Sequence, residues 1–258
     1  MRRVSVDETA LAYATAGDGV ETVAFLPDVG FGPWLWGWQA PALAGPYRTV
    51  VVATRGTDGS DQNGPYDVDR LAADLDAVLA DTGAHSTHLV GAGLGGMVAL
   101  RYAREYGRAR SLVLLDTAAS GEAIDRVALS TLHPSDRSKL RESLSLAFSE
   151  GYLESVNVDR IVKWRAEEDA TGDALAGHVD AALSFEAGPR YELTLPALVC
   201  HGVDDPVVPI DDGRALAESL PRGRFESVHG KRLCYLEHSA AVTDAIEAFL
   251  DDVTESGF

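Results

Sequence analysis

Leu89-Val90-Gly91-Ala92-Gly93-Leu94-Gly95-Gly96 is a glycine-rich run of this 258-residue chain and gives the clearest indication of its fold. The run Thr87–Val90, which leads into it, is apolar and predicts a buried strand. The residues Leu94–Tyr106 have helical period, so the glycines predict a tight turn between a strand and a helix. A strand followed at once by a helix is the unit from which parallel sheets are built.

On both sides of this turn, the sequence predicts further strands and helices that alternate at similar spacing. The predicted strands are Val4–Val6 and Leu11–Thr15 as a hairpin, then Thr22–Leu26, Thr49–Ala53, Ser111–Leu115, Ala197–His201 and Arg224–His229. The predicted helices outside the central turn are Val68–Thr82, Asp212–Ser219 and Ala240–Asp252. Most of these strands are apolar throughout, which predicts a parallel sheet covered by helices on both faces.

The pattern changes between Thr117 and about Arg190. Strand-like runs vanish there, and the helical stretches Ser138–Phe148, Val158–Glu168 and Ala174–Phe185 take their place. We therefore predict an α/β core domain of residues 1–116 and 191–258, interrupted by a helical cap insertion of residues 117–190. We expect the tail Thr254–Phe258 to be frayed.

Charge and composition exclude several functional classes. The chain carries 40 acidic against 22 basic residues, a net charge of −18, and only three of its basic residues are lysines. Such a field repels nucleic acid and anionic lipid. It is typical of halophilic proteins, although a generic acidic surface gives the same balance. No apolar run reaches about 18 residues, so no membrane span is expected. The polar N-terminus and the two cysteines, Cys200 and Cys234, favour a cytoplasmic protein without disulfides.

Four motifs in series carry a resemblance to a known family. They are the turn Leu89–Gly96, the loop Arg55-Gly56-Thr57-Asp58-Gly59-Ser60-Asp61, the segment His201-Gly202-Val203-Asp204-Asp205-Pro206-Val207-Val208-Pro209, and the run Leu233-Cys234-Tyr235-Leu236-Glu237-His238. In this order they resemble α/β-hydrolases with a cap, of the esterase, lactonase and C–C hydrolase type. The resemblance covers nearly the whole chain. It implies a mostly parallel eight-stranded sheet, helices on both faces and a helical cap.

The same resemblance implies a reaction centre from which two of three groups are missing. The family uses a serine that attacks, a histidine that takes its proton and an acid that orients the histidine. The acid position is Asp205, but the nucleophile position is Gly93 and the histidine position is Arg232. Glycine has no side chain with which to attack, and arginine stays protonated near neutral pH.

The neighbouring positions are also unusual. In the family, the loop after the third strand supplies an N–H to the oxyanion hole, and here that loop reads Pro27-Asp28-Val29. A carboxylate at Asp28 that points inward would oppose a developing oxyanion. The resemblance places Asp28, Val29, Leu94, Trp34 and His229 as candidate binding residues around the pocket.

Other residues offer alternatives to the missing groups. Cys234 is a candidate thiol nucleophile, and His229 is a candidate base or an ordinary histidine at a strand end. Trp34, Trp36 and Trp38 either line the pocket mouth or cover the sheet edge. The cysteines and histidines match no metal-ligand spacing, so we expect no metal and no cofactor.

Arg232 and Asp205 are expected to form an ion pair, which acts either as a structural bridge or as a contact for an anionic or polar ligand.

The sequence is compatible with three functions. The first is a protein that has lost serine hydrolysis but keeps its pocket, and so binds a small molecule or does non-covalent chemistry. The second is a hydrolase or lyase of another mechanism, with Asp28, Asp205 or His229 as the acid–base group. The third is a protein-interaction scaffold with a closed pocket. A wide cavity above Gly93 favours the first two, and a collapsed one favours the third. Self-association into a homo-oligomer stays open.

Overall fold

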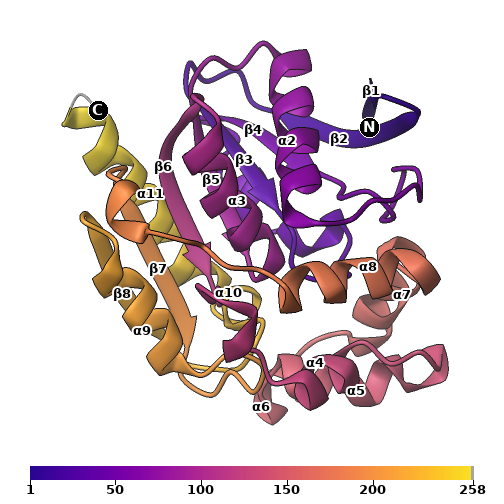
Figure 1. Ribbon diagram of the computed structural model, residues 1–258. Coiled ribbons are helices and arrows are strands. Elements are labelled where there is room, and N and C mark those ends of the chain that lie inside the picture. The colour runs from indigo at the N-terminus through magenta and orange to yellow at the C-terminus, as the bar shows by residue number, and fades with distance from the viewer. Residues whose placement is uncertain (257–258) are drawn as a thin grey trace.

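One sheet of eight strands organises the computed structural model, which describes residues 1–256 (Figure 1). The strand order is β1-β2-β4-β3-β5-β6-β7-β8. The strands are β1 (Arg2–Val6), β2 (Thr9–Ala16), β3 (Thr22–Leu26), β4 (Arg48–Val52), β5 (Thr87–Ala92), β6 (Ala109–Leu115), β7 (Ala197–Gly202) and β8 (Gly223–Val228). Only β2 pairs antiparallel with its neighbours, β1 and β4; all other neighbours are parallel. The predicted fold class, a mostly parallel eight-stranded sheet with helices on both faces, is therefore confirmed.

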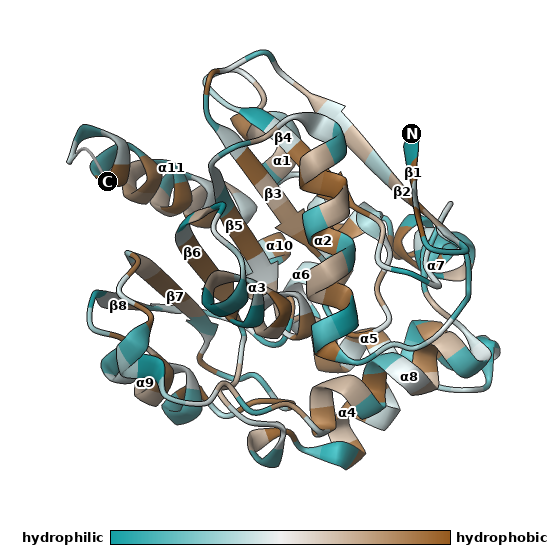
Figure 2. Ribbon diagram, turned by 45° about the horizontal axis from the view of Figure 1, so that its top comes forward, coloured by the Kyte–Doolittle hydropathy of each residue, from teal (hydrophilic) through white to brown (hydrophobic). Residues whose placement is uncertain are grey.

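The central strands are buried because both of their faces are covered. Every residue of β3, β5 and β7 is buried, as the continuous apolar runs predict, whereas the edge strand β8 is exposed at Arg224, Glu226 and Ser227. Figure 2 shows the same contrast, with brown strands at the centre and teal faces on the surrounding helices.

Helices cover the two faces of the sheet. They are α1 (Gln39–Leu43), α2 (Val68–Thr82), α3 (Leu94–Glu105), α9 (Ile210–Ser219), α10 (Cys234–Glu237) and α11 (Ser239–Glu255). The helices α2 and α3 pack together on one face, and α11 lies on the other with α1 and α10 (Figure 1). The carboxylate of Asp67 accepts the Arg70 N–H and so caps α2, which ends at Gly83 in the left-handed conformation.

Between β6 and β7 the chain forms five α-helices, α4 (Arg126–Leu132), α5 (Leu140–Ala147), α6 (Glu150–Ser155), α7 (Val158–Glu168) and α8 (Gly172–Leu183). The strands β3, β5, β6 and β7 point toward this group of helices, which lies beyond their carboxyl ends (Figure 1). Only an isolated bridge between Ser120 and Glu186 interrupts the helical character of the segment. Its division from residues 1–116 and 191–258 as a separate cap stays a prediction.

The ends of several elements differ from the prediction. Helix α11 continues through Thr254 and Glu255, so these two residues are not frayed. The hydroxyl of Thr254 donates to Glu21 at 2.6 Å, a contact between residues that are far apart in the chain. The last two residues of the predicted tail lie outside the described residues. The short helices α1, α4, α6 and α10 lack enough turns to show helical period in the sequence.

Within residues 1–256, no helix combines the length and the apolar character that crossing a membrane requires.

Candidate functional site

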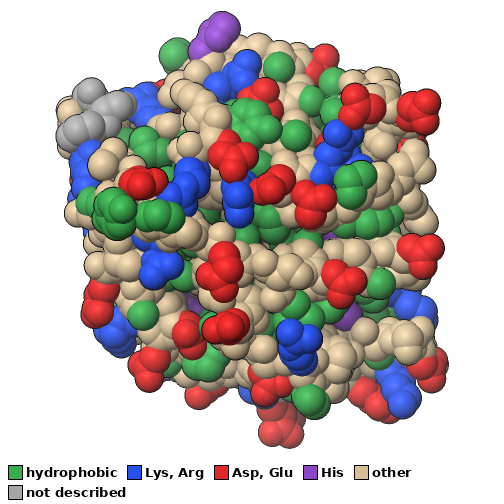
Figure 3. Space-filling view, in the orientation of Figure 1, with side chains coloured by type: hydrophobic (Ala, Val, Ile, Leu, Met, Phe, Trp, Pro, Cys, Tyr) green, Lys and Arg blue, Asp and Glu red, His purple; other side chains and the backbone are tan. Residues whose placement is uncertain are grey.

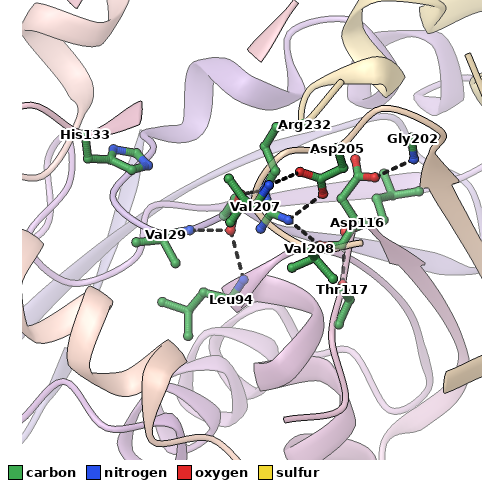
Figure 4. A network of polar contacts seen from close by, with 12 residues as sticks. Val29, Leu94, Asp116, Thr117, His133, Gly202, Asp205, Val207, Val208 and Arg232 are labelled. Atoms are coloured by element: carbon green, nitrogen blue, oxygen red, sulfur yellow. Dashed lines mark hydrogen bonds and ion pairs between the residues drawn. The ribbon is translucent and has the colours of Figure 1, made fainter. Parts of the chain in front are cut away.

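Four charged residues and one glycine, each from a different loop, come together at the carboxyl ends of the parallel strands. Asp28 follows β3, Asp116 follows β6, and Asp205 lies in the loop after β7. Arg232 lies between β8 and α10, and Gly93 forms the turn between β5 and α3. The carboxyl ends of neighbouring parallel strands open onto the same edge of a sheet, which is the usual place for a binding site. Figure 4 shows how Arg232, Asp205 and Asp116 meet there.

Arg232 is the centre of this cluster. Its Nε donates to Oδ2 of Asp28 at 2.8 Å, and its Nη1 donates to Oδ2 of Asp205 at 2.9 Å. The same Nη1 donates to the backbone carbonyl of Asp116 at 2.7 Å. The Arg232 side chain is only 2 % exposed, and the side chains of Asp28 and Asp205 are buried with it. The ion pair expected between Arg232 and Asp205 is therefore present, and Asp28 joins it.

The other oxygen of Asp28 is held by two backbone amides. Oδ1 accepts the N–H of Val29 at 2.6 Å and the N–H of Leu94 at 3.0 Å. Leu94 is the first residue of α3, so its N–H lies at the positive end of the helix dipole. Two convergent amides of this kind form an anion site, and the Asp28 carboxylate is the anion that fills it. Figure 4 shows Val29 and Leu94 on either side of this oxygen.

Gly93 leaves room for this arrangement. Its φ is +45°, a conformation that glycine adopts at little cost. A Cβ added at this position would lie 1.8 Å from Oδ1 of Asp28 and 2.3 Å from Nη2 of Arg232. The volume above the turn is therefore taken up by the carboxylate and the guanidinium themselves.

Asp116 extends the cluster toward β7. It is fully buried at φ +46°, a strained conformation for a residue with a Cβ. Its Oδ1 accepts the Gly202 N–H at 2.7 Å, and the Cys234 thiol contacts its Oδ2 at 3.5 Å. Burial raises the pKa of Asp116 well above its usual value, and the neighbouring Asp205 charge raises it further.

Burial and neighbouring charges shift the pKa values of Arg232 and Cys234. Burial opposes the charge of Arg232, but Asp28 and Asp205 outweigh it, so the pKa of the guanidinium lies well above its ordinary value. Burial also raises the pKa of the Cys234 thiol, which keeps it protonated and a poor nucleophile. The candidate nucleophile Cys234 is therefore not activated in this structure.

Asp116, His201 and Asp205 are close enough to be considered as metal ligands, since one ligand atom from each lies within 4.8 Å of the others. However, Nε2 of His201 lies 2.9 Å from the carbonyl oxygen of Val208, which can only accept a hydrogen bond. This nitrogen therefore carries a proton and has no lone pair for a metal. The Arg232 charge beside Asp205 further opposes a cation.

Buried hydrogen bonds attach the helices after β6 to the loops that follow β3 and β4. Oδ1 of Asp169 accepts the Gly32 N–H at 3.1 Å and the indole N–H of Trp34 at 2.8 Å. Arg165 holds the other oxygen of Asp169 at 2.9 Å. On α8, His178 bonds the Gly30 N–H through Nδ1 at 3.3 Å and the Arg55 carbonyl through Nε2 at 2.9 Å.

The remaining candidate residues lie apart from this cluster. His229 is exposed, and no residue of the described chain gives it a hydrogen-bond or ion-pair partner. Trp34 stacks on Trp164, and Trp36 stacks on Tyr235. Trp34 and Trp36 line an open hollow of about 580 Å³ beside β2 and β4, and Trp38 contacts Trp164 edge-on.

Sequence reasoning missed three residues that build the site. Asp116 directly follows the buried end of strand β6, and that position is a signal that the sequence offers. Asp169 and His178 lie inside the helical segment, where nothing in the local pattern distinguishes them from exposed polar residues. Val29 and Leu94 do belong to the site, but through their backbone amides and not through their side chains.

The hollows found in the described part of the structure lie elsewhere. A narrow cavity of about 20 Å³ lies beneath Leu94, between the sheet and helices α2 and α3, and larger hollows open on the outer surface. Gly93, Asp28 and Arg232 line none of these hollows.

Residues 23–246 match the model of a family described as the alpha/beta hydrolase family. The chain is 25% identical over 256 residues to a 3-oxoadipate enol-lactonase of Acinetobacter baylyi, covering 96% of this chain and 95% of that protein. It is 30% identical over 244 residues to a 2-hydroxy-6-oxononadienedioate/2-hydroxy-6-oxononatrienedioate hydrolase of Paraburkholderia phymatum. This alignment covers 84% of this chain and 82% of that protein. The crystal structure of an enol-lactonase from Burkholderia xenovorans superposes with a TM-score of 0.86 at 22% identity, over 97% of this chain and all of that one.

Proposed function

The chain belongs to the alpha/beta hydrolase family, and we propose that within this family it is a member without serine-dependent hydrolysis. Its reaction centre is filled by its own side chains. The observation that carries the proposal is the position of Asp28, whose carboxylate oxygen accepts the amides of Val29 and Leu94. These are the amides that stabilise the oxyanion in relatives that hydrolyse esters.

A substrate carbonyl and Asp28 compete for the same two amides. In an active serine hydrolase, the oxygen of the tetrahedral intermediate accepts these hydrogen bonds as it gains negative charge. Here the site already holds a full negative charge, which Arg232 anchors from the other side at 2.8 Å. An incoming carbonyl would have to displace a buried, hydrogen-bonded ion pair, which is costly.

The nucleophile position supports the same conclusion. Gly93 has no side chain, and the position that the Cβ of a serine would take is occupied by Asp28 and Arg232. Arg232, at the histidine position, holds its proton too tightly to act as a base. Asp205 keeps the position of the family acid and now orients a guanidinium instead of an imidazole.

A closed centre favours an interaction protein over an enzyme. The two side chains that fill the space above Gly93 are both buried and paired, so a ligand could enter there only if they moved. The helices α4–α8, which we propose act as a cap, are held down by Asp169 and His178. In this proposal the cluster joins the core to the cap, and partners bind elsewhere on the molecule.

One observation supports a second candidate, a hydrolase of another mechanism. Asp116 combines a strained backbone with a raised pKa, and both are common among acid–base groups of active sites. In this candidate Asp116, not His229, supplies the proton, because His229 lies exposed and away from the cluster.

A substrate screen separates the two candidates. The purified protein is assayed with an activated ester, a lactone and a thioester, and is treated in parallel with a fluorophosphonate probe. We expect rates equal to the buffer blank and no labelled serine. Labelling would reveal a nucleophile that the structure does not indicate. Enzymatic turnover without labelling would favour the mechanism through Asp116.

A further inference from the structure

The opposite edge of the sheet carries a feature that the proposed function does not use. Two adjoining hollows of about 730 and 250 Å³ open at the amino ends of the parallel strands and share His85, Ser86 and Arg110 as lining residues. Four arginines line them: Arg48 begins β4, Arg108 and Arg110 flank the start of β6, and Arg222 precedes β8. We call these two hollows the arginine edge. In Figure 3, which has the orientation of Figure 1, the end of the molecule at which these strands begin lies toward the top, where blue side chains appear.

The arginine edge contrasts with the rest of the molecule. The chain has a net charge of −18, yet Glu21 is the only carboxylate among the residues that line the two hollows. The lining residues supply four guanidinium groups against this one carboxylate, and Asp76 compensates Arg108 from outside the lining. The remaining excess of positive charge attracts anions despite the overall charge of the molecule.

The positive charge of Arg48 is not neutralised by a carboxylate of the protein. Its guanidinium donates to the hydroxyl of Thr22 at 3.0 and 3.3 Å and to the carbonyl of Thr82 at 3.2 Å. All of these acceptors are neutral, and no carboxylate of residues 1–256 forms an ion pair with Arg48. A half-buried cation without a counter-ion is an available site for an external anion.

Glu21, a residue of the protein itself, would compete with an external anion for Arg110. It pairs with Arg110, lies 3.2 Å from Nε2 of His88 and accepts the Thr254 hydroxyl. Even so, Nε of Arg110 is buried without a hydrogen-bond partner among the described residues. Arg108 pairs separately with Asp76.

We propose that the arginine edge binds a small phosphate-bearing anion, with a diphosphate or longer phosphate chain reaching across the two hollows. Guanidinium groups pair with phosphate oxygens through two parallel hydrogen bonds, and the hydroxyls of Ser86 and Thr194 line the same hollows as further donors. A single carboxylate meets only one guanidinium, whereas a phosphate chain meets arginines from several strands. Nucleic acid is disfavoured, since its long backbone would meet the acidic surface around the edge.

Calorimetric titration with sodium pyrophosphate at low ionic strength tests this proposal. We expect saturable binding that weakens as salt is added. Arg110→Gln and, independently, the exposed Arg222→Gln should each weaken binding by about tenfold or more, because each removes charge-assisted hydrogen bonds. Glu21→Gln should tighten binding, because it removes the competing carboxylate while keeping the shape of the side chain.

Arg224→Gln is the matched control, since Arg224 pairs with Asp252 at 2.8 Å on the surface and lines neither hollow. It should leave binding unchanged. Tighter binding of ATP than of pyrophosphate would indicate a nucleotide, and equal binding would indicate that the phosphate chain suffices. No binding by the parent protein, or equal weakening in Arg224→Gln, would overturn the proposal.

Discussion

Asp28 determines the chemistry of the strand ends. One of its oxygens accepts the amides of Val29 and Leu94, and the other accepts Nε of Arg232. Each buried charge therefore has a partner, which is the condition for keeping charges in a protein interior. Without Asp28, the Nε of Arg232 would lose its acceptor and Asp205 would be its remaining ion-pair partner. Without Arg232, Asp28 would be a buried anion held by backbone amides alone, so each residue stabilises the other. The glycine at position 93 is what allows both to fit.

Gly93→Ser should destabilise the protein strongly. The new Cβ would meet Asp28 and Arg232 at 1.8 and 2.3 Å, and the backbone at φ +45° would be strained. We expect a loss of about 3 kcal/mol or more in the free energy of unfolding, measured with urea. Gly151→Ser is the control, since a Cβ there meets nothing within 4 Å. Equal stability of the two variants would show that Asp28 and Arg232 can move aside at little cost in free energy.

The same contacts change what is needed to build a hydrolase on this scaffold. The double variant Gly93→Ser, Arg232→His would restore, beside Asp205, the serine and the histidine that the family uses. The structure adds a third requirement, because Asp28 would still occupy the two amides. We expect the triple variant with Asp28→Gly to hydrolyse p-nitrophenyl acetate faster than the double variant. A double variant that already matches the triple would mean that Asp28 is not the obstacle.

At the scale of elements, α8 holds the helical segment to the core through His178. Burial lowers the pKa of His178 to about 4, below the value near 6.5 of an unfolded chain. Between these two pH values the unfolded chain binds a proton that the folded protein does not bind. Stability should therefore fall as the pH falls from about 6.5 to about 4, by on the order of 3 kcal/mol from this residue.

His178→Gln tests this linkage, because glutamine can donate to the Arg55 carbonyl and accept from the Gly30 amide without titrating. The variant should lose less stability than the parent over that pH range, as followed by urea unfolding. His229→Gln, a change at an exposed histidine, should keep the pH dependence of the parent. If the two variants behave alike, the protonation of His178 does not govern the loss.

Most elements of the core could be predicted because their signals are local. The apolar runs of β3, β5 and β6 and the glycine turn at Gly93 lie within single segments, and burial on both faces makes such strands apolar throughout. Helix α11 extends past its predicted end through Thr254, whose hydroxyl bonds Glu21. That contact joins residues 233 positions apart in the chain, and local patterns do not report it.

The site was predictable in its positions but not in its contacts. The motifs placed Asp205, Gly93 and Arg232 at one end of the sheet, and the ion pair between Arg232 and Asp205 followed from them. The direction in which Asp28 points depends on a side-chain torsion and on a partner 204 residues away. Asp169 and His178 depend on how the helices after β6 fold back onto the core, which no single segment encodes.

At the scale of the whole molecule, the charge is unevenly spread. The carboxyl ends of the strands bury acidic residues around Arg232, the amino ends carry the arginine edge, and the chain as a whole has a net charge of −18. A charge of this size repels itself in the compact state. The expected halophilic character therefore stays a prediction about stability, which can be measured directly.

Raising KCl from about 0.1 M to about 1 M should increase the stability of the protein. The Debye length falls from about 10 Å to about 3 Å over this range, which screens repulsion among the surface carboxylates. We expect the thermal midpoint to rise by several degrees, followed by circular dichroism. A midpoint that falls would mean that the surface ion pairs, such as Arg224 with Asp252, outweigh the repulsion.

We propose that the pair of amides that binds the oxyanion in serine hydrolases is intact in this protein and is occupied by Asp28. Thermal unfolding of Asp28→Ala with and without sodium formate, at constant ionic strength, tests it most directly. Formate should take the place of the missing carboxylate and raise the midpoint of Asp28→Ala, by about 3 °C for each kcal/mol of binding. The parent protein should not respond, and neither should Gly151→Ser, which removes no carboxylate. An equal rise in all three proteins, or no rise in Asp28→Ala, would show that Asp28 does not occupy an anion site.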